Sequence, residues 1–289
     1  MRRDFVSLRV RIPPQGSYES AAPGVGAPPR PGPADPWRRL GGRALAALFA
    51  SACLGCGGAL AWSRCPLLLC TACERELRAP AEPACRGCGR PLLGMGATAA
   101  DALALVCGGC RQQPPAWHAL AAAYLYRRPL VGVVRALKFR RAEHLGAALA
   151  APLATRCRAL DAAIDVVVPV PLAWTRLLAR GYNQAEAIAA PLAADLGLPM
   201  ARLLRRQPRP RQALLRREQR RRNLRGAFTV RERARRDVPL RTVLLVDDVM
   251  TTGATLAAAA AALRRAGVGR VVAAVAARTP EASWDETAQ

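Results

Sequence analysis

The sequence predicts an α/β protein whose mostly parallel sheet is flanked by helices and preceded by a small cysteine-rich module. From about residue 117 onward, short apolar runs alternate with alanine-rich segments of helical length, which is the pattern of a parallel sheet. Nine of the ten cysteines lie between residues 53 and 110. The length of 289 residues suffices for about two domains.

The α/β part contains four expected strands and four expected helices. The strands are short apolar runs, and the helices are rich in alanine. Gly267 follows the last helix as a C-terminal stop signal, and a further short helix over residues 43–52 leads into the cysteines. The strands are expected at residues 121–126, 165–170, 243–246 and 270–276, and the helices at 130–138, 145–160, 184–196 and 255–266.

The chain is strongly basic. It carries 44 Lys and Arg residues against 20 Asp and Glu residues, which gives a net charge of +24. A surface of this charge attracts polyanions, so nucleic acid is an expected partner. Lys138 is the only lysine, so a bias toward arginine contributes to this composition.

No segment is expected to insert into a membrane. A spanning helix needs about 20 consecutive apolar residues, and the longest candidate, residues 254–277, is interrupted by Arg264, Arg265 and Arg270. The basic start at Met1 is not followed by an apolar run, so we expect no secretory signal and a cytoplasmic location.

Eight cysteines form four Cys-x2-Cys pairs. Two residues between thiolates let one tight turn direct both sulfurs at one metal, and two pairs complete a tetrahedral zinc site. Eight ligands therefore fit two structural Zn2+ ions. Grouping the pairs in chain order leaves loops of 13 and 18 residues, but interleaved or nested sites, and a set of disulfides, are open alternatives. The expected metal ligands are Cys53, Cys56, Cys70, Cys73, Cys85, Cys88, Cys107 and Cys110.

A second motif lies at residues 243–255. An apolar strand is expected to end at Asp247 and Asp248, and a short Thr/Gly loop then leads into an alanine-rich helix. Amide groups at a helix N-terminus hold phosphate well, whereas two carboxylates suit hydroxyl groups or a divalent cation. A phosphorylated sugar with a vicinal diol, together with Mg2+, satisfies both; a solvated Asp pair beside a helix cap is the alternative. The phosphate would contact Thr251, Thr252, Gly253, Ala254 and Thr255.

The same segment closely resembles the 5-phosphoribosyl-1-pyrophosphate (PRPP) motif of type I phosphoribosyltransferases. The resemblance implies a sheet like that of this family. It also implies that Asp247 and Asp248 contact the ribose hydroxyls while the loop surrounds the 5′-phosphate.

An earlier strand end matches the place where that family holds pyrophosphate. Residues 166–172 end in a prolyl turn at Pro171 and Leu172. The loop is expected to continue to Arg176 and Arg180, and a guanidinium binds phosphate oxygens in bidentate fashion. Taken alone, this stretch could equally be any prolyl turn leading into a helix.

A third segment is dense in arginine. Between Arg202 and Arg236 there are 15 arginines in 35 residues, which indicates an exposed arm. The arm could close over pyrophosphate as a lid or bind a nucleic-acid backbone. A solvated surface that reflects the arginine bias is the third alternative.

The order of these motifs resembles the competence protein F (ComF) family. There the cysteine-rich N-terminus is a double zinc ribbon, and the resemblance makes Lys138, Arg220 and Asn223 further candidates for binding the substrate. Members are associated with natural transformation and with handling incoming single-stranded DNA, which implies single-stranded DNA and other competence proteins as partners. The matching segments are residues 137–139, 168–172, 180–184, 212–228 and 246–255.

The resemblance spans residues 43–279 and leads to two functional hypotheses. The first is an enzyme that binds PRPP with Mg2+ and transfers its phosphoribosyl group to an unknown acceptor. The alternative is a non-catalytic adaptor that binds single-stranded DNA through the zinc module and the arginine-rich segment. The expected divisions are a disordered basic tail rich in Pro and Gly (1–42), a double zinc ribbon (43–115), a phosphoribosyltransferase-like domain (116–280) and a short tail (281–289).

Overall fold

The computed structural model describes residues 52–60, 65–92, 105–160, 162–207, 226–231, 241–281 and 284. The chain divides into two compact units, Met1–Leu48 and Phe49–Gln289, and every described residue belongs to the second. The expected tail at 1–42, and the expected helix at 43–52 except for its last residue, lie outside the described residues, as do Arg220 and Asn223.

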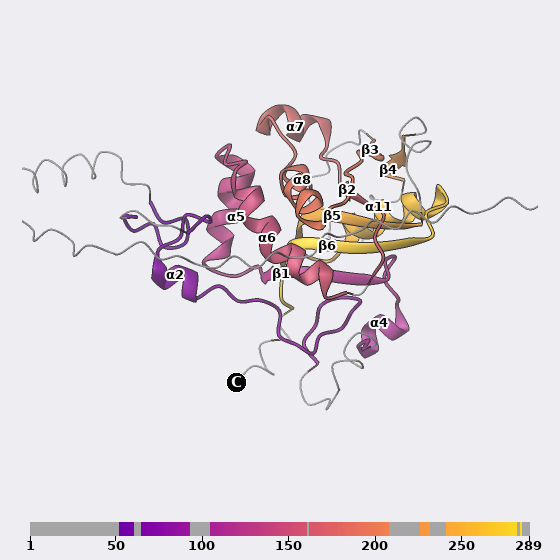
Figure 1. Cartoon of the computed structure of the whole chain (residues 1–289), viewed down its shortest axis with the longest axis horizontal. Helices are drawn as coiled ribbons and strands as arrows, with labels where there is room; N and C mark the ends of the chain where they lie inside the picture. The colour runs from indigo at the N-terminus through magenta and orange to yellow at the C-terminus, as the bar shows by residue number, and fades with distance from the viewer. Residues whose placement is uncertain are drawn as a thin grey trace, which may run out of the picture. The chain divides into compact units, whose positions relative to one another are not determined.

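The central sheet has four parallel strands in the order β1-β6-β5-β2 (Figure 1). In its middle, Val243 of β5 lies between Val166 of β2 and Val271 of β6. The parallel α/β architecture predicted from the alternating segments is therefore confirmed. The strands are β1 (Ala119–Leu125), β2 (Val166–Pro169), β5 (Thr242–Met250) and β6 (Arg270–Arg278).

Helices cover both sides of the sheet, and each side has its own core because successive strand residues face opposite ways. Leu244 and Val246 belong to the core under three helices, and Val243 and Leu245 belong to the core under the fourth. All four predicted helices are present, with ends that differ by at most two residues. Helices α5 (Leu130–Phe139), α6 (Leu145–Arg158) and α8 (Gln184–Leu196) contribute to the first core, and α11 (Ala254–Arg265) to the second.

Strand β5 is longer than predicted. We expected it to end at Val246, before the two aspartates, but Asp247 pairs with Val275 and Val249 pairs with Ala277. The prediction is wrong because β6 continues alongside and supplies backbone partners, so the polar residues remain in the ladder. The aspartates are therefore held by a regular strand.

A helix replaces part of the expected loop after β2. Residues 174–180 form α7 (Trp174–Arg180), where we expected a loop continuing to Arg180. Gly181 ends the helix in the left-handed region at φ +83°, a conformation that glycine adopts without steric cost. The arginines of this segment are thus placed by a helix.

Two three-residue strands form a separate antiparallel ribbon that the sequence analysis did not predict. Arg205 of one strand pairs with Thr229 of the other. The chain that joins them is most of the arginine-rich segment and lies outside the described residues. The ribbon consists of β3 (Leu204–Arg206) and β4 (Phe228–Val230).

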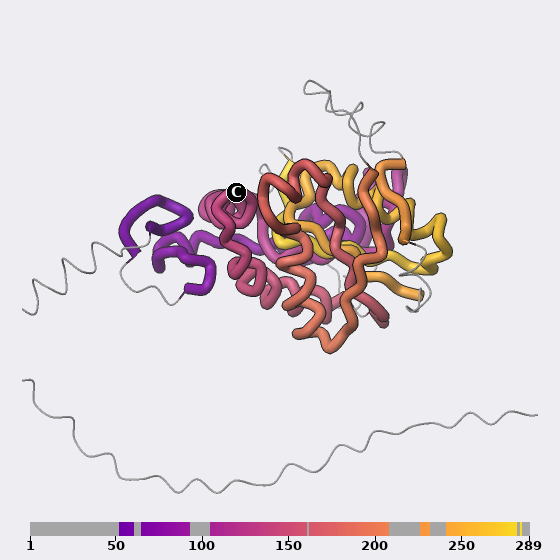
Figure 2. The backbone as a smooth tube through the Cα atoms, turned by 90° about the horizontal axis from the view of Figure 1, so that it is seen from above, coloured from indigo at the N-terminus to yellow at the C-terminus, as the bar shows by residue number. Residues whose placement is uncertain are grey.

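The cysteines occupy two segments that pack on different parts of the α/β unit. The first includes α2 (Thr71–Arg75) and lies beside α5 in the tube view (Figure 2). The approach is so close that a Cβ atom on Gly132 would lie 1.6 Å from the carbonyl oxygen of Leu54. The second includes α4 (Gly108–Gln112), and its Arg86 carbonyl accepts a 2.8 Å hydrogen bond from the Leu120 amide of β1. Among the described helices, none is long and apolar enough to cross a membrane.

Candidate active site and metal centres

The two aspartates of β5 lie in different environments. Asp248 shares the side of α5, and its Oδ2 atom lies 3.0 Å from Nζ of Lys138 in the last turn of that helix. Asp247 is on the opposite side, because neighbouring residues of a strand alternate. Burial raises the pKa of the Asp247 carboxyl to about 7, the charge of Asp248 adds to the shift, and Lys138 and Arg206 oppose it. Asp247 can therefore gain or lose a proton near neutral pH.

A tight loop follows β5 and leads into α11. Gly253 is the N-cap residue, with φ +73°, and no side chain caps the helix there. The hydroxyl of Thr252 accepts a hydrogen bond of 3.4 Å from the Ala254 amide. The first amide groups of a helix point along its axis and can bind an anion, so residues 251–255, called the phosphate loop below, have the geometry that phosphate binding requires.

A basic cavity lies beside Asp248. It has a volume of about 560 Å³ and is lined by Lys138, Arg141, Arg176 and Arg180. The guanidinium of Arg180 lies 5.0 Å from the centre of the Phe139 ring and donates a 2.8 Å hydrogen bond to Gln184. Burial lowers the pKa of Arg180, although the charge of Asp248 opposes this. The structure thus brings Arg176 and Arg180, which the sequence analysis proposed for pyrophosphate, together with Lys138, which it proposed for substrate binding.

A second cavity lies on the other side of α7, with a volume of about 850 Å³. Pro171 and Leu172 line this cavity and not the basic one. Arg206, which the sequence analysis did not single out, also lines it, and its positive charge acts on Asp247. Burial lowers the pKa of Arg206, and the charge of Arg176 lowers it further. These charges place Arg206 in the same electrostatic neighbourhood as the aspartates and the basic cavity.

The eight paired cysteines form two groups of four that follow chain order. Within each group the four Sγ atoms lie within 4.8 Å of one another, so each group could hold one metal ion. The interleaved and nested groupings are thereby excluded, and no disulfide joins cysteines in the described part of the chain. We call them the first tetrad (Cys53, Cys56, Cys70 and Cys73) and the second tetrad (Cys85, Cys88, Cys107 and Cys110).

The chemistry of the tetrads fits a soft divalent cation. A hydrogen bond from Cys88 lowers the pKa of the Cys85 thiol to about 4, while burial opposes the shift. Burial raises the pKa of Cys110 to about 12, and the negative charge of Cys85 adds to it. Four sulfurs this close cannot all be thiolates without a cation between them, and a tetrahedral S4 set is typical of zinc.

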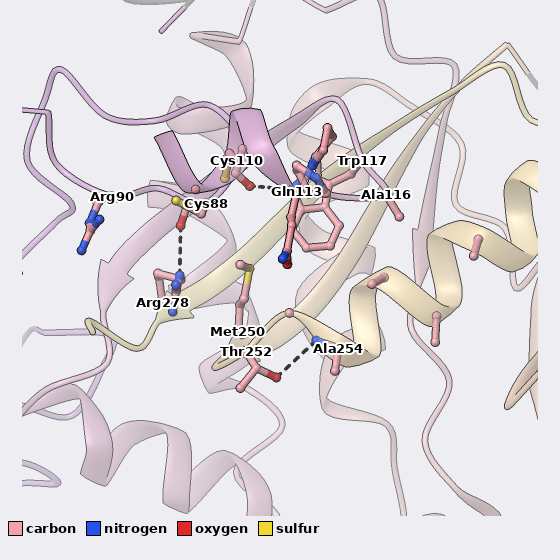
Figure 3. A pocket seen from close by; sticks show the side chains of 18 of the residues that line it. Cys88, Arg90, Cys110, Gln113, Ala116, Trp117, Met250, Thr252, Ala254 and Arg278 are labelled. Carbon is pink, nitrogen blue, oxygen red and sulfur yellow. Dashed lines mark hydrogen bonds between the residues drawn. The ribbon is translucent and has the colours of Figure 1, made fainter. Parts of the chain in front are cut away.

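Two residues that the sequence analysis missed lie between the second tetrad and the phosphate loop. Trp117 and Arg278 line a cavity of about 740 Å³ that is bounded by the tetrad on one side and by α11 on the other (Figure 3). Arg278 is 2% exposed, and Trp117 is 7% exposed. In a chain with so many arginines, no sequence pattern distinguishes Arg278 from the other arginines.

These features define a protein with a phosphoribosyltransferase domain, and the phosphoribosyl transferase domain family matches residues 141–287. The chain is 31% identical over 211 residues to competence protein F of Haemophilus influenzae, covering 70% of this chain and 87% of that protein. It is 35% identical over 228 residues to the DNA utilization protein YhgH of Salmonella typhi, covering 73% of this chain and 93% of that protein. The chain therefore belongs to the family of competence protein F and YhgH, which confirms the resemblance found in the sequence.

Proposed function

We propose that the protein binds PRPP together with Mg2+ and transfers its phosphoribosyl group to a nucleophile. The observation that carries the proposal is the convergence of Lys138, Arg176 and Arg180 on one cavity, joined to Asp248 by a 3.0 Å ion pair. A dense cluster of cations beside a carboxylate suits a ligand with a pyrophosphate and a sugar diol. The phosphate loop begins three residues after this carboxylate.

Each part of PRPP has a proposed partner. Asp247 and Asp248 accept hydrogen bonds from the ribose hydroxyls, and the phosphate loop holds the 5′-phosphate through the amides of α11. Mg2+ enters with the pyrophosphate, whose oxygens suit this hard cation. Pyrophosphate is held by Lys138, Arg176 and Arg180, with Arg220 and Asn223 as further proposed partners, whereas Pro171 and Leu172 line the second cavity.

The chemistry is a substitution at C1′ of the ribose. The bond from C1′ to the pyrophosphate oxygen breaks, pyrophosphate leaves with the electron pair, and an amine or base nitrogen forms the new bond and loses a proton. Positive side chains stabilise the charge that develops on the leaving group, and one such donor is worth about 10²–10³ in rate. The basic cavity supplies these cations.

We propose Zn2+ for both tetrads, with a structural role, because a closed set of four thiolates leaves no open coordination position. Thiolates must remain reduced to bind it, which fits the reducing cytoplasm. The zinc sites would then fix the two cysteine segments against the α/β unit.

Isothermal titration with PRPP and Mg2+ tests the proposal. The double variant Asp247→Asn plus Asp248→Asn should bind at least about 100-fold more weakly, since it removes two charged hydrogen-bond acceptors. Asp195→Asn is the matched control, because Asp195 pairs with Arg158 at the end of α8, outside the site. Absence of PRPP binding by the intact protein, or equal binding by the double variant, would contradict the proposal. Pyrophosphate release with a panel of amines, bases and oligonucleotides then identifies the acceptor.

Single-stranded DNA binding is a second candidate function. Phe139 is 71% exposed and lines the basic cavity, while Trp174 is 66% exposed and lines the second cavity together with Arg206. Aromatic rings stack on bases while nearby arginines hold the phosphates. The names of the relatives refer to competence and DNA utilization, which supports this partner and, with it, other competence proteins.

Affinity for an oligonucleotide across a salt series tests this candidate. Binding should weaken steeply with salt, and Trp174→Ala should weaken it by about tenfold or more, in line with the energy of one base stack. Leu178→Ala is the control, since Leu178 is equally exposed at 66% but cannot stack. A flat salt response would remove the DNA-binding hypothesis.

A further inference from the structure

The second tetrad is hydrogen-bonded to the phosphate loop through Arg278. Its Nε atom donates a 3.0 Å hydrogen bond to the carbonyl of Cys88, and its Nη1 atom donates a 2.7 Å hydrogen bond to the carbonyl of Thr251. One planar side chain therefore binds a backbone carbonyl of a cysteine of the second tetrad and a backbone carbonyl of the phosphate loop. Figure 3 shows the bond between Arg278 and Cys88. The relative orientation of these two carbonyls is set by the rigid guanidinium.

Trp117 makes a second connection between the same two segments. Its indole Nε1 donates a 2.8 Å hydrogen bond to the carbonyl of Gly87, in the turn between Cys85 and Cys88. The far edge of the ring lies against Gly253, where an added Cβ atom would be 2.8 Å from Cη2. The turn of the second tetrad is thus connected to both ends of the loop segment 251–253 through the side chains of Arg278 and Trp117.

The first tetrad has a different environment. The turns themselves have the same internal bonds, since the amides of Cys53 and Gly57 bond within the first turn as those of Cys85 and Gly89 bond within the second. The difference lies in the part of the α/β unit that each tetrad contacts. The first tetrad packs on α5, at the close approach of Gly132 and Leu54. The two metal centres therefore differ in what they can influence.

Burying the charged side chain of Arg278 costs free energy, which argues that the charge serves a structural or functional role. A buried cation is stable only when its donors are satisfied. Arg278 donates to the carbonyls of Cys88, Thr251 and Thr279, and it lies 3.3 Å from Glu281 and 4.8 Å from the ring centre of Trp284. An apolar side chain could fill the same space, but it could not orient two carbonyls that belong to separate segments.

We propose that metal binding at the second tetrad and phosphate binding at residues 251–255 are energetically coupled, with Arg278 and Trp117 as the positioning residues. The metal fixes the turn that contains Gly87 and Cys88, and the two side chains transmit that position to Thr251 and Gly253. Coupling between two sites is reciprocal, so bound phosphate also strengthens metal retention. The identity of the phosphate ligand rests on the proposed function, whereas the mechanical link does not.

The first test compares two fragments of PRPP in titrations of the zinc-loaded protein. Arg278→Met should bind ribose 5-phosphate about tenfold more weakly, the effect of losing one strong hydrogen bond, but should bind pyrophosphate with Mg2+ like the parent protein. Arg86→Met is the matched control, because Arg86 bonds the same turn to the His118 carbonyl of the α/β unit and not to the phosphate loop. Trp117→Phe, which removes both the indole donor and the ring edge that lies against Gly253, should resemble Arg278→Met. Equal ribose 5-phosphate affinity in Arg278→Met and the parent protein, with both folded, overturns the coupling.

The second test measures the link without relying on PRPP. Removing zinc from the parent protein with a chelator should accelerate hydrogen exchange at the amides of residues 252–254, because the loop loses its support. In Arg278→Met these amides should already exchange faster with zinc present. Loop amides that exchange at the same rate with and without zinc overturn the inference, even if the intact protein binds PRPP. If the intact protein binds no PRPP but the loop responds to zinc, the proposed function fails and the coupling stands.

Discussion

Lys138 and Asp248 join the last turn of α5 to the end of β5, with 3.0 Å between Nζ and Oδ2. Lys138 also lines the basic cavity, so its ammonium can contact both the Asp248 carboxylate and an anion in that cavity. The chain uses arginine at every other cationic position. A compact ammonium fits between two anions where a planar guanidinium needs more room.

Lys138→Met should weaken pyrophosphate binding by about tenfold, since it removes one charged contact. Lys138→Arg should recover only part of the affinity because of its different shape. Titration of pyrophosphate with Mg2+ measures both effects. The control is Arg140→Met, because Arg140 follows Lys138 at the end of α5 without lining the cavity. Unchanged affinity in Lys138→Met would remove Lys138 from the site.

PRPP affinity should rise between pH 6 and pH 8. Burial and the charge of Asp248 raise the pKa of Asp247 to about 7, and only the ionised carboxylate accepts hydrogen bonds from hydroxyl groups with both oxygens. PRPP affinity increases with pH because raising the pH through 7 deprotonates Asp247 and strengthens binding. The contribution of Asp247 is the difference between the profiles of the parent protein and Asp247→Asn, since ionisation of the ligand is common to both. Two parallel profiles would contradict the prediction.

Asp247→Asn should also stabilise the unliganded protein, more at pH 8 than at pH 5. A carboxyl group whose pKa is higher in the folded state than in the unfolded chain lowers the free energy of unfolding as the pH rises from about 4 to 7. The asparagine amide stays neutral at both pH values, so the variant does not lose this stability as the pH rises. Thermal unfolding of both proteins at the two pH values measures the difference, and a gain that is equal at both would show that Asp247 titrates normally.

Gly253→Ala should affect both stability and phosphate binding. Its φ of +73° costs an L-residue about 1–2 kcal/mol, and the new Cβ atom would lie 2.8 Å from Trp117. Gly197→Ala is the matched control, because Gly197 has φ +66° at the end of α8 with no atom within 4 Å. Both variants should unfold at lower temperature, but only Gly253→Ala should lose affinity for ribose 5-phosphate. Equal affinity in the two variants would show that crowding at Gly253 is unimportant.

Gly132→Ala should detach the first cysteine segment from α5. The added Cβ atom would lie 1.6 Å from a backbone carbonyl, which cannot move away like a flexible side chain. Overpacking of this kind costs about 1–3 kcal/mol or more. A chelator should then remove zinc faster from the first tetrad. Gly109→Ala, at a helical glycine with nothing within 4 Å of an added Cβ atom, should not have this effect.

The sequence predicted the larger elements because their signals are long. Strands and helices such as residues 270–276 and 184–196 contain apolar runs or periodic patterns that tertiary packing only extends. The seven residues of α7 are too few for a periodic signal, although Gly181 marks its end. The three-residue strands β3 and β4 have an even weaker local sequence signal, because they form strands only by pairing with residues distant in sequence.

The residues of the candidate site also fall into those that a local sequence motif predicts and those that depend on the folded chain. The residues of the phosphate loop, and the cations at positions 138, 176 and 180, follow from local motifs. The grouping of the cysteines does not, because all four pairs have the same spacing and only the folded chain brings particular pairs together. Arg206 and Trp117 were missed since their roles depend on contacts with residues far away in sequence.

The regular backbone of β5 around Asp247 and Asp248 has one more consequence. Adjacent carboxylates on a strand point in opposite directions, so these two aspartates do not bind one ligand atom from the same side of the strand. Asp248 forms its ion pair with Lys138, whereas Asp247 lies on the opposite side of the strand. Deleting a single residue from the strand before the doublet would exchange these sides and break the ion pair, although the sequence would still contain two adjacent aspartates.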